Sequence, residues 1–280
     1  MKTIVITGAS DGIGTAAAER LAEEGHHVVL VGRSPTKTAA VASRIGAPYH
    51  IVDFAELAQV RSLASELAAT YPRIDVLANN AGGIMGERQL TGDGFEQTFQ
   101  VNHLAPFLLT TSLMPHLIES KASVLQTSSS AAKNYGNIDI DDLQNAKRYS
   151  PQKAYGDAKL TNILFTKELH RRFHEQEISS AAFHPGVVAT GFASDTTHLM
   201  RFVYHTKLVR RFLVSPEDGA TGLATLAQDQ EGRSWHSGNF YAKGKLATSA
   251  AQADDIDLAR DLWDHSQALL DGWSRHAPQT

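Results

Sequence analysis

Cysteine is absent from this sequence of 280 residues, which excludes disulfides and thiolate chemistry. An apolar run long enough to cross a membrane is absent as well. The formal net charge is −4 and no block of like charges exceeds a few residues, so nothing favours nucleic-acid binding. The histidines lack metal-ligand spacing, and we expect no metal site. Because the lack of cysteine fits a reducing compartment and no signal peptide precedes the first predicted strand, we expect a cytoplasmic protein without a transmembrane segment.

Predicted strands and helices alternate along the whole chain. Short apolar segments rich in β-branched residues predict seven strands, at 2–6, 27–31, 48–52, 75–78, 123–127, 178–183 and 238–241. Helices are predicted at 15–22, 57–69, 95–117 and 155–173, and Ser215-Pro216 is typical of another helix start. The pattern predicts a single-domain α/β Rossmann fold over residues 1–280, with a doubly wound parallel seven-stranded sheet and helices on both faces.

A glycine-rich turn joins the first predicted strand to the first predicted helix. The segment Thr7-Gly8-Ala9-Ser10-Asp11-Gly12-Ile13-Gly14 places backbone N–H groups and a positive helix terminus where a pyrophosphate can approach. Gly8 would allow the tight turn, Gly12 the close approach of a phosphate, and Gly14 close packing of helix on strand. The alternative is a glycine-rich turn without a ligand; the strand–turn–helix context favours a dinucleotide site.

The end of the second predicted strand indicates which dinucleotide is bound. An acidic residue there would bind the ribose 2′-hydroxyl of NAD, but the chain reads Gly32-Arg33-Ser34. Arg33 would pair with the 2′-phosphate of NADP(H), with Ser34 and Lys37 adding contacts. The alternative is a solvated loop arginine. We therefore predict NADP(H) as the cofactor.

A tyrosine and a lysine four residues apart predict the chemistry. Tyr155 and Lys159 share one face of a helix. A free phenol has a pKa near 10, and a neighbouring ammonium favours the phenolate and lowers that pKa. Tyr155 would then exchange a proton with a carbonyl or alcohol oxygen. A tyrosine and a lysine at this spacing are common on ordinary helices. The pair becomes informative when a dinucleotide-binding loop precedes it in the chain.

Taken together, these motifs resemble the short-chain dehydrogenase/reductase family. The resemblance rests on Thr7 to Gly14, Asn79-Asn80-Ala81-Gly82, Tyr155 with Lys159, and Pro185-Gly186, and it runs from Lys2 to about Leu246. It implies a catalytic set of Asn102, Ser129, Tyr155 and Lys159. Ser128 and Ser130 are alternatives to Ser129. Successive side chains of a strand point to opposite faces, so Ser129 would face away from both of these neighbours.

Further site residues follow from the same resemblance. Asp53 would contact the adenine, Thr190 the carboxamide, and Lys159 the nicotinamide ribose. The implied cofactor site comprises Gly8, Ser10, Asp11, Gly12, Ile13, Gly14, Arg33, Ser34, Asp53, Phe54, Asn80, Ala81, Gly82, Tyr155, Lys159, Pro185, Gly186, Val188 and Thr190.

Closer likeness, in 101–110, 142–150, 158–166 and 184–188, is to the branch containing retinol dehydrogenases and related carbonyl reductases. It implies a lipophilic aldehyde or ketone substrate. We expect a lid at about 190–216 and substrate contacts from Ile84, Tyr135, Phe192, Met200 and Tyr204. The basic and apolar residues of that segment also suit a membrane-surface helix or ordinary packing.

The expected function is reversible NADPH-dependent reduction of such a carbonyl. The alternatives are an NAD-dependent alcohol dehydrogenase and a non-catalytic NADP(H)-sensing regulator. The resemblance leaves a homo-oligomer open as well as a monomer.

Overall fold

The computed structural model describes residues 1–186 and 215–276. The strands are β1 (Thr3–Thr7), β2 (His27–Gly32), β3 (Tyr49–Ile51), β4 (Val76–Asn79), β5 (Ser123–Thr127), β6 (Ser179–His184), β7 (Asn239–Ala242) and β8 (Lys245–Leu246). The longer helices are α1 (Gly12–Glu23), α2 (Pro35–Ile45), α3 (Leu57–Thr70), α5 (Ala105–Ser120), α7 (Pro151–Phe173), α10 (Pro216–Gln228) and α11 (Ile256–His276). Two short helices, α4 (Gln97–Phe99) and α6 (Ala131–Tyr135), accompany them.

All these strands form one sheet in the order β3-β2-β1-β4-β5-β6-β7-β8. Every neighbouring pair from β3 to β7 is parallel, which confirms the doubly wound sheet expected from the sequence. The count of seven strands was one short, since β8 pairs antiparallel with β7. Lys243 and Gly244 both have positive φ, 52° and 69°, and form the two-residue turn that reverses the chain.

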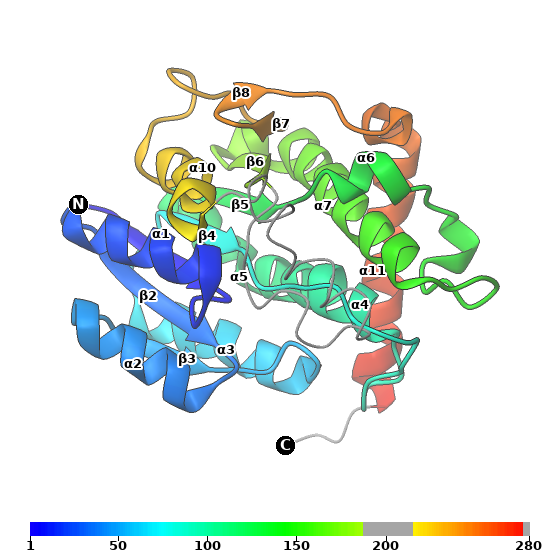
Figure 1. Cartoon of the computed structure of the whole chain (residues 1–280), viewed down its shortest axis with the longest axis horizontal. Helices are drawn as coiled ribbons and strands as arrows, with labels where there is room; N and C mark the ends of the chain where they lie inside the picture. The colour runs from blue at the N-terminus through cyan, green and yellow to red at the C-terminus, as the bar shows by residue number, and fades with distance from the viewer. Residues whose placement is uncertain (187–214, 277–280) are drawn as a thin grey trace, which may run out of the picture.

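Side-chain alternation along the strands sends apolar residues into two cores. Val5, Val29 and Leu77 point to one face and pack with α3, α5 and α7. Ile4 and Ile6, one position away, point to the other face and pack with α1, α2 and α10. Figure 1 shows these two helical layers on either side of the sheet.

The strand order reverses between β1 and β4, because successive strands are added on one side of β1 up to β3 and on the other side from β4. Doubly wound sheets bind ligands beyond the carboxyl ends of their strands at such a switch point. The glycine turn follows β1 and the segment starting at Asn80 follows β4, so the fold brings both motifs to this position.

The helix α11 was not predicted from the sequence. It packs against α7 (Figure 1). Trp263 of α11 lies against Phe107 and Phe165, with ring centroids 4.9 and 5.6 Å apart. The region predicted as one helix at 95–117 contains a π-helical turn, Gln100–Leu104, between α4 and α5. No helix within the described ranges is both long and apolar enough to cross a bilayer.

Candidate functional site

A cleft of about 740 Å³ lies beyond the carboxyl ends of the central strands and collects most of the predicted site. The predicted residues that line it are Gly8, Ser10, Asp11, Gly12, Ile13, Arg33, Ser34, Asp53, Phe54, Asn80, Ala81, Gly82, Ile84, Ser129, Tyr135, Tyr155, Lys159, Pro185 and Gly186. Gly14 and Asn102 lie behind its walls and do not line it. The remaining predicted contacts, Val188, Thr190, Phe192, Met200 and Tyr204, lie outside the described residues, as does most of the expected lid.

The glycine turn is shaped by close backbone approaches. Gly8 has a φ of +66°, and a Cβ there would lie 2.8 Å from the Cα of Ala81. A Cβ on Gly14 would collide with the carbonyl oxygen of Gly8. The carboxylate of Asp11 caps α1 by accepting a hydrogen bond of 2.8 Å from the N–H of Gly12. Gly12 and Ile13, at the start of α1, line the cleft, where a phosphate could approach the helix terminus.

Asn80 holds the ends of three strands together. Its Nδ2 donates to the carbonyl oxygen of Thr7 at 3.0 Å, and its Oδ1 accepts from the hydroxyl of Thr127 at 3.1 Å. The hydroxyl oxygen of Thr7 accepts from the N–H groups of Asn80 and Ala81 at 3.0 and 2.9 Å. These bonds fix the floor of the cleft at the switch point.

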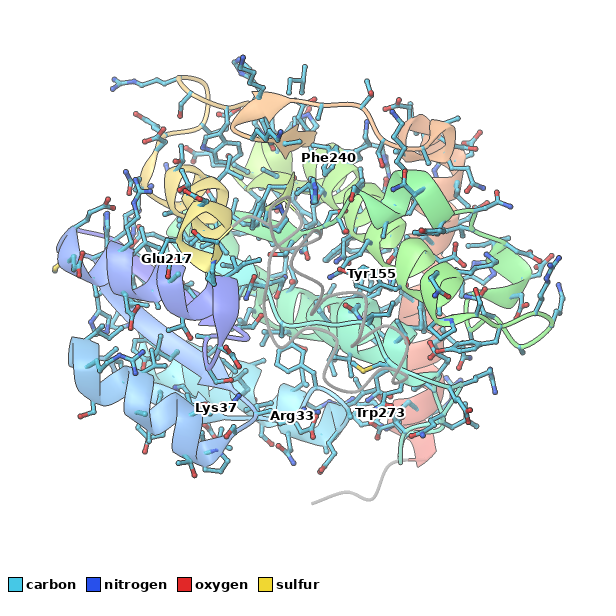
Figure 2. The ribbon with its side chains drawn as sticks, in the orientation of Figure 1. Arg33, Lys37, Tyr155, Glu217, Phe240 and Trp273 are labelled. Carbon is cyan, nitrogen blue, oxygen red and sulfur yellow. The ribbon has the colours of Figure 1, made fainter. Side chains whose placement is uncertain are left out.

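The predicted 2′-phosphate end is lined by Arg33, Ser34 and Lys37. Arg33 is exposed, and within the described ranges its guanidinium forms no ion pair. Lys37 instead pairs with Asp11 at 2.8 Å across the mouth of the glycine turn. Figure 2 shows Arg33 and Lys37 in the lower part of the molecule, below Tyr155 on α7. Among the described residues at this end of the cleft, Arg33 is therefore the cation left available for an anionic group.

Tyr155 and Lys159 lie together on α7, which begins with Ser150 as its cap and Pro151 in its first turn. The Nζ of Lys159 lies 5.5 Å from the ring centroid of Tyr155 and donates to the carbonyl oxygen of Thr127 at 3.1 Å. Lys159 is only 2% exposed, and burial lowers its pKa to about 7 from an ordinary value of 10.5. A buried cation thus adjoins a phenol that faces the cleft, which suits proton exchange with a bound oxygen.

Three consecutive serines follow β5 and all line the cleft. The alternation used to separate Ser129 from its neighbours does not apply, because β5 ends at Thr127. The hydroxyl of buried Ser128 donates to the carbonyl oxygen of Lys159 at 2.7 Å. The hydroxyl oxygen of Ser129 accepts from the N–H of Ala131 at 3.1 Å, which leaves its proton for another acceptor.

Asn102 lies in the π-helical turn and braces the loop after β4. Its Nδ2 donates to the carbonyl oxygens of Gly83 and Thr98, both at 2.9 Å, and its Oδ1 accepts from the N–H of Gly83 at 3.0 Å. The side chain is fully buried, so its contacts position the backbone of Gly82 and Gly83.

Asn134, Gln152 and His184 also line the cleft but were not predicted as site residues. Gln152 precedes Tyr155 by three residues, a helical spacing that would have placed it on the same face. Burial, and secondarily Lys243, lowers the pKa of His184, and its buried Nδ1 lacks a partner among the described residues.

The part of the chain that the structure describes contains no group of three histidine, cysteine or carboxylate side chains able to hold a metal ion. The tyrosine–lysine pair and the serine hydroxyl can exchange a proton with a bound oxygen, whereas a hydride would have to come from a dinucleotide held in the cleft.

Comparison with known proteins gives consistent matches. The sequence model of the family described as short chain dehydrogenase matches residues 2–200. A Streptomyces sp. (strain C5) protein named as a daunorubicin C-13 ketoreductase, DnrU, is 39% identical over 281 residues, covering 98% of this chain and 94% of that protein. Human retinol dehydrogenase 13 is 36% identical over 280 residues, covering 96% and 84% respectively. The crystal structure of an Escherichia coli CFT073 short chain dehydrogenase complexed with NADPH is 27% identical, with a TM-score of 0.67, and covers 86% of this chain and 96% of that one.

Proposed function

Because this chain belongs to the short-chain dehydrogenase/reductase family, in its retinol dehydrogenase-like branch, it is an oxidoreductase of carbonyl and alcohol groups, and we propose that it reduces a lipophilic aldehyde or ketone with NADPH. The observation that carries the proposal is the position of Tyr155 and Lys159, on one face of α7, in the same cleft as the glycine turn and Arg33. The reaction is reversible in principle, as alcohol oxidation.

The residues present fit an NADP(H) dinucleotide. The cradle at Gly8 and Gly14 has no room for side chains, which suits the pyrophosphate. The strand β2 ends at Gly32 without a carboxylate, and Arg33 offers an exposed guanidinium for a 2′-phosphate. The NADPH complex of the E. coli family member is compatible with this assignment. Bound nicotinamide would supply the hydride that reduces the carbonyl carbon.

The chain's own residues would bind the substrate carbonyl oxygen and supply its proton. The phenol of Tyr155 gives its proton to the carbonyl oxygen while the carbon accepts the hydride, so the C=O bond becomes a C–OH group. The hydroxyl of Ser129 donates a hydrogen bond to the same oxygen. The ammonium of Lys159 favours the phenolate left on Tyr155 until it is reprotonated. Asn102 holds the loop that forms one wall of this site.

An apolar body next to the carbonyl fits the described part of the cleft. Ile84, Ala131 and Tyr155 form a buried apolar cluster there. The names of the relatives, a daunorubicin C-13 ketoreductase and a retinol dehydrogenase, both refer to substrates with a large carbon skeleton, and this supports a lipophilic substrate. The lid over 190–216, a cytoplasmic location and a homo-oligomer stay proposals. Protection from proteolysis on substrate binding would test the lid. Cell fractionation would test the location, and light scattering the oligomeric state.

The experiment is oxidation of NADPH against a panel of aldehydes, ketones and quinones, in parallel with NADH and with Tyr155→Phe. Turnover that prefers NADPH and falls at least about 100-fold in the variant supports the proposal. A preference for NADH would support the NAD-dependent alcohol dehydrogenase instead. Binding of NADPH without turnover across the panel would favour a cofactor-sensing regulator.

A further inference from the structure

The two halves of the cleft differ in charge. The charged side chains that line it, apart from Lys159, all come from the segments after β1, β2 and β3, namely Asp11, Arg33, Lys37 and Asp53. The half built from the segments after β4 and β5 and from α7 has Lys159 as its one charged side chain within the described ranges, and that ammonium donates to Thr127. Since a buried carboxylate or phosphate needs a paired cation, this half suits an uncharged substrate.

The floor of the half of the cleft that contains Tyr155 is apolar. Ile84 from the loop after β4, Ala131 from α6 and the ring of Tyr155 from α7 are each no more than 9% exposed and pack against one another. The catalytic hydroxyl of Tyr155 is carried by one of these three side chains, so the substrate carbonyl and its neighbouring carbons would lie on an apolar surface.

Polar side chains lie one helical turn away from this floor. Gln152 precedes Tyr155 by three residues on α7, and Asn134 and Tyr135 follow Ala131 by three and four residues on α6. One turn corresponds to about 5 Å along a helix axis. Gly136 and Gly156 let the two helices meet, since a Cβ on Gly156 would lie 2.7 Å from the Cβ of Tyr135. The polar groups of both helices therefore adjoin the same part of the cleft.

Among the residues that the structure describes, these polar groups have no hydrogen-bonding partner, and Asn134 and Tyr135 are exposed to solvent. The side-chain amides of Gln152 and Asn134 and the hydroxyl of Tyr135 line the cleft, and no hydrogen bond joins them to any residue that the structure describes. Two carboxamides and a phenol supply donors and acceptors but no charge. Their placement suits hydroxyl or carbonyl substituents of a ligand held on the apolar floor.

We propose that the substrate is a neutral carbonyl compound with an apolar ring body and hydrogen-bonding substituents a few bonds from the reacting carbon, selected by Gln152 and Asn134. This inference rests on the proposed reductase function and narrows its substrate class. It distinguishes polyhydroxylated cyclic ketones from plain hydrocarbon aldehydes, which would form no hydrogen bond with either carboxamide.

The experiment compares 2-tetralone with its 5-, 6-, 7- and 8-hydroxy derivatives and with a ring-carboxylated analogue. We expect at least one hydroxylated isomer to exceed the parent ketone in kcat/KM by about 5- to 10-fold, mainly through KM, because a neutral hydrogen bond contributes about that factor. The carboxylated analogue is expected to be the poorest substrate. Gln152→Leu or Asn134→Leu should reduce the ratio of kcat/KM for the hydroxylated isomer to kcat/KM for the parent ketone toward one.

The matched control is Gln176→Leu, the same chemical change in the exposed 3-10 turn His174–Gln176 that follows α7, which should leave the preference intact. Unchanged NADPH affinity shows that each variant is folded. Calorimetry in the presence of NADP⁺, which cannot reduce a ketone, measures the same preference without turnover. Selective binding of a hydroxylated isomer without reduction would support the substrate class and contradict the reductase function. Equal binding of all analogues, lack of binding, or a preference unaffected by both substitutions would overturn the inference.

Discussion

Asn102 and Lys159 meet at Gly82. A Cβ on Gly82 would collide with the Oδ1 of Asn102 and lie 3.1 Å from the Nζ of Lys159. The amide comes from the π-helical turn before α5 and the ammonium from α7, so this one glycine sits between two elements that approach the cleft from different directions. The positions of both side chains therefore depend on the absence of a side chain at residue 82.

Gly82→Ala is expected to reduce turnover strongly and stability moderately. The added methyl group must displace the amide of Asn102, which makes three hydrogen bonds, or the ammonium beside Tyr155. We expect kcat to fall at least about 10-fold and the unfolding free energy by about 1–3 kcal/mol. Steady-state kinetics and urea denaturation measure the two effects.

Gly83→Ala is the control for this prediction. A Cβ at Gly83 would meet nothing within 4 Å, so the neighbouring substitution adds the same methyl group without the collision. It should keep most of the wild-type kcat. Equal losses in both variants would show that the Gly82 contact does not control the position of Asn102 or Lys159.

Arg33→Ala tests the proposed 2′-phosphate contact. The guanidinium has no acidic partner within the described ranges, so its removal breaks no ion pair and leaves the fold intact. We expect KM for NADPH to rise about 10-fold while KM for NADH changes less than about twofold, because only NADPH carries the extra phosphate. Initial rates at varied cofactor concentration provide the measurement.

Arg44→Ala is the matched control for Arg33, since it removes an exposed arginine from α2 that pairs with Glu19 and does not line the cleft. It should leave both KM values unchanged. If Arg33→Ala raised KM for both cofactors equally, the 2′-phosphate assignment would be wrong and the arginine would act on a group common to both.

The parts of the site that could be predicted are those whose chemistry is local in sequence. Gly8, Arg33 and Tyr155 line the cleft as expected because a strand–turn–helix junction, a strand end and an i,i+4 pair each determine their own surroundings. Seven of the strands were likewise predicted, since their apolar β-branched residues are contiguous.

What could not be predicted depends on contacts distant in sequence or on unusual backbone geometry. The helix α11 is fixed by Trp263 against Phe165, almost a hundred residues away. The strand β8 requires positive φ at Lys243, which a lysine rarely adopts. The inward hydrogen bonds of Asn102 follow from a π-helical turn that helical periodicity does not reveal.

His103→Gln is expected to weaken the pH dependence of stability in acid. His103 is 1% exposed, its Nε2 lies 2.9 Å from the hydroxyl of Ser266 on α11, and burial lowers its pKa to about 3. Between pH 6.5 and about 3 the unfolded chain binds a proton at this residue that the folded chain does not, so stability falls as the pH falls.

Urea midpoints from pH 7 to pH 4.5 measure this slope. We expect it to be shallower in His103→Gln than in the wild type, with lower stability at pH 7 because aromatic packing is lost. His265→Gln, a change at an exposed position of α11, should keep the wild-type slope. Parallel slopes in all three proteins would show that His103 does not bind the proton on unfolding.

Lys159→Met is expected to stabilise the cofactor-free protein while it abolishes turnover. The ammonium is buried, and its pKa near 7 means that the folded state disfavours the charge. Methionine fills similar space, and Thr127 keeps a hydrogen bond to its carbonyl oxygen because Asn162 also donates to it, at 3.2 Å. Removal of the buried cation should therefore raise the melting temperature, by at least about 3 °C at pH 6.5.

The pH dependence of this gain gives the sharper test. Below pH 7 the lysine is protonated in both states, so the full cost of burying its charge is present. From pH 7 toward 10.5 the unfolded state holds more protons than the folded one, and wild-type stability rises with pH. The advantage of Lys159→Met should accordingly shrink between pH 7 and pH 9 in thermal unfolding, whereas a constant advantage would show that packing, and not the buried charge, is the cause. Lost turnover together with raised stability would identify Lys159 as a residue retained for the reaction at the expense of the fold.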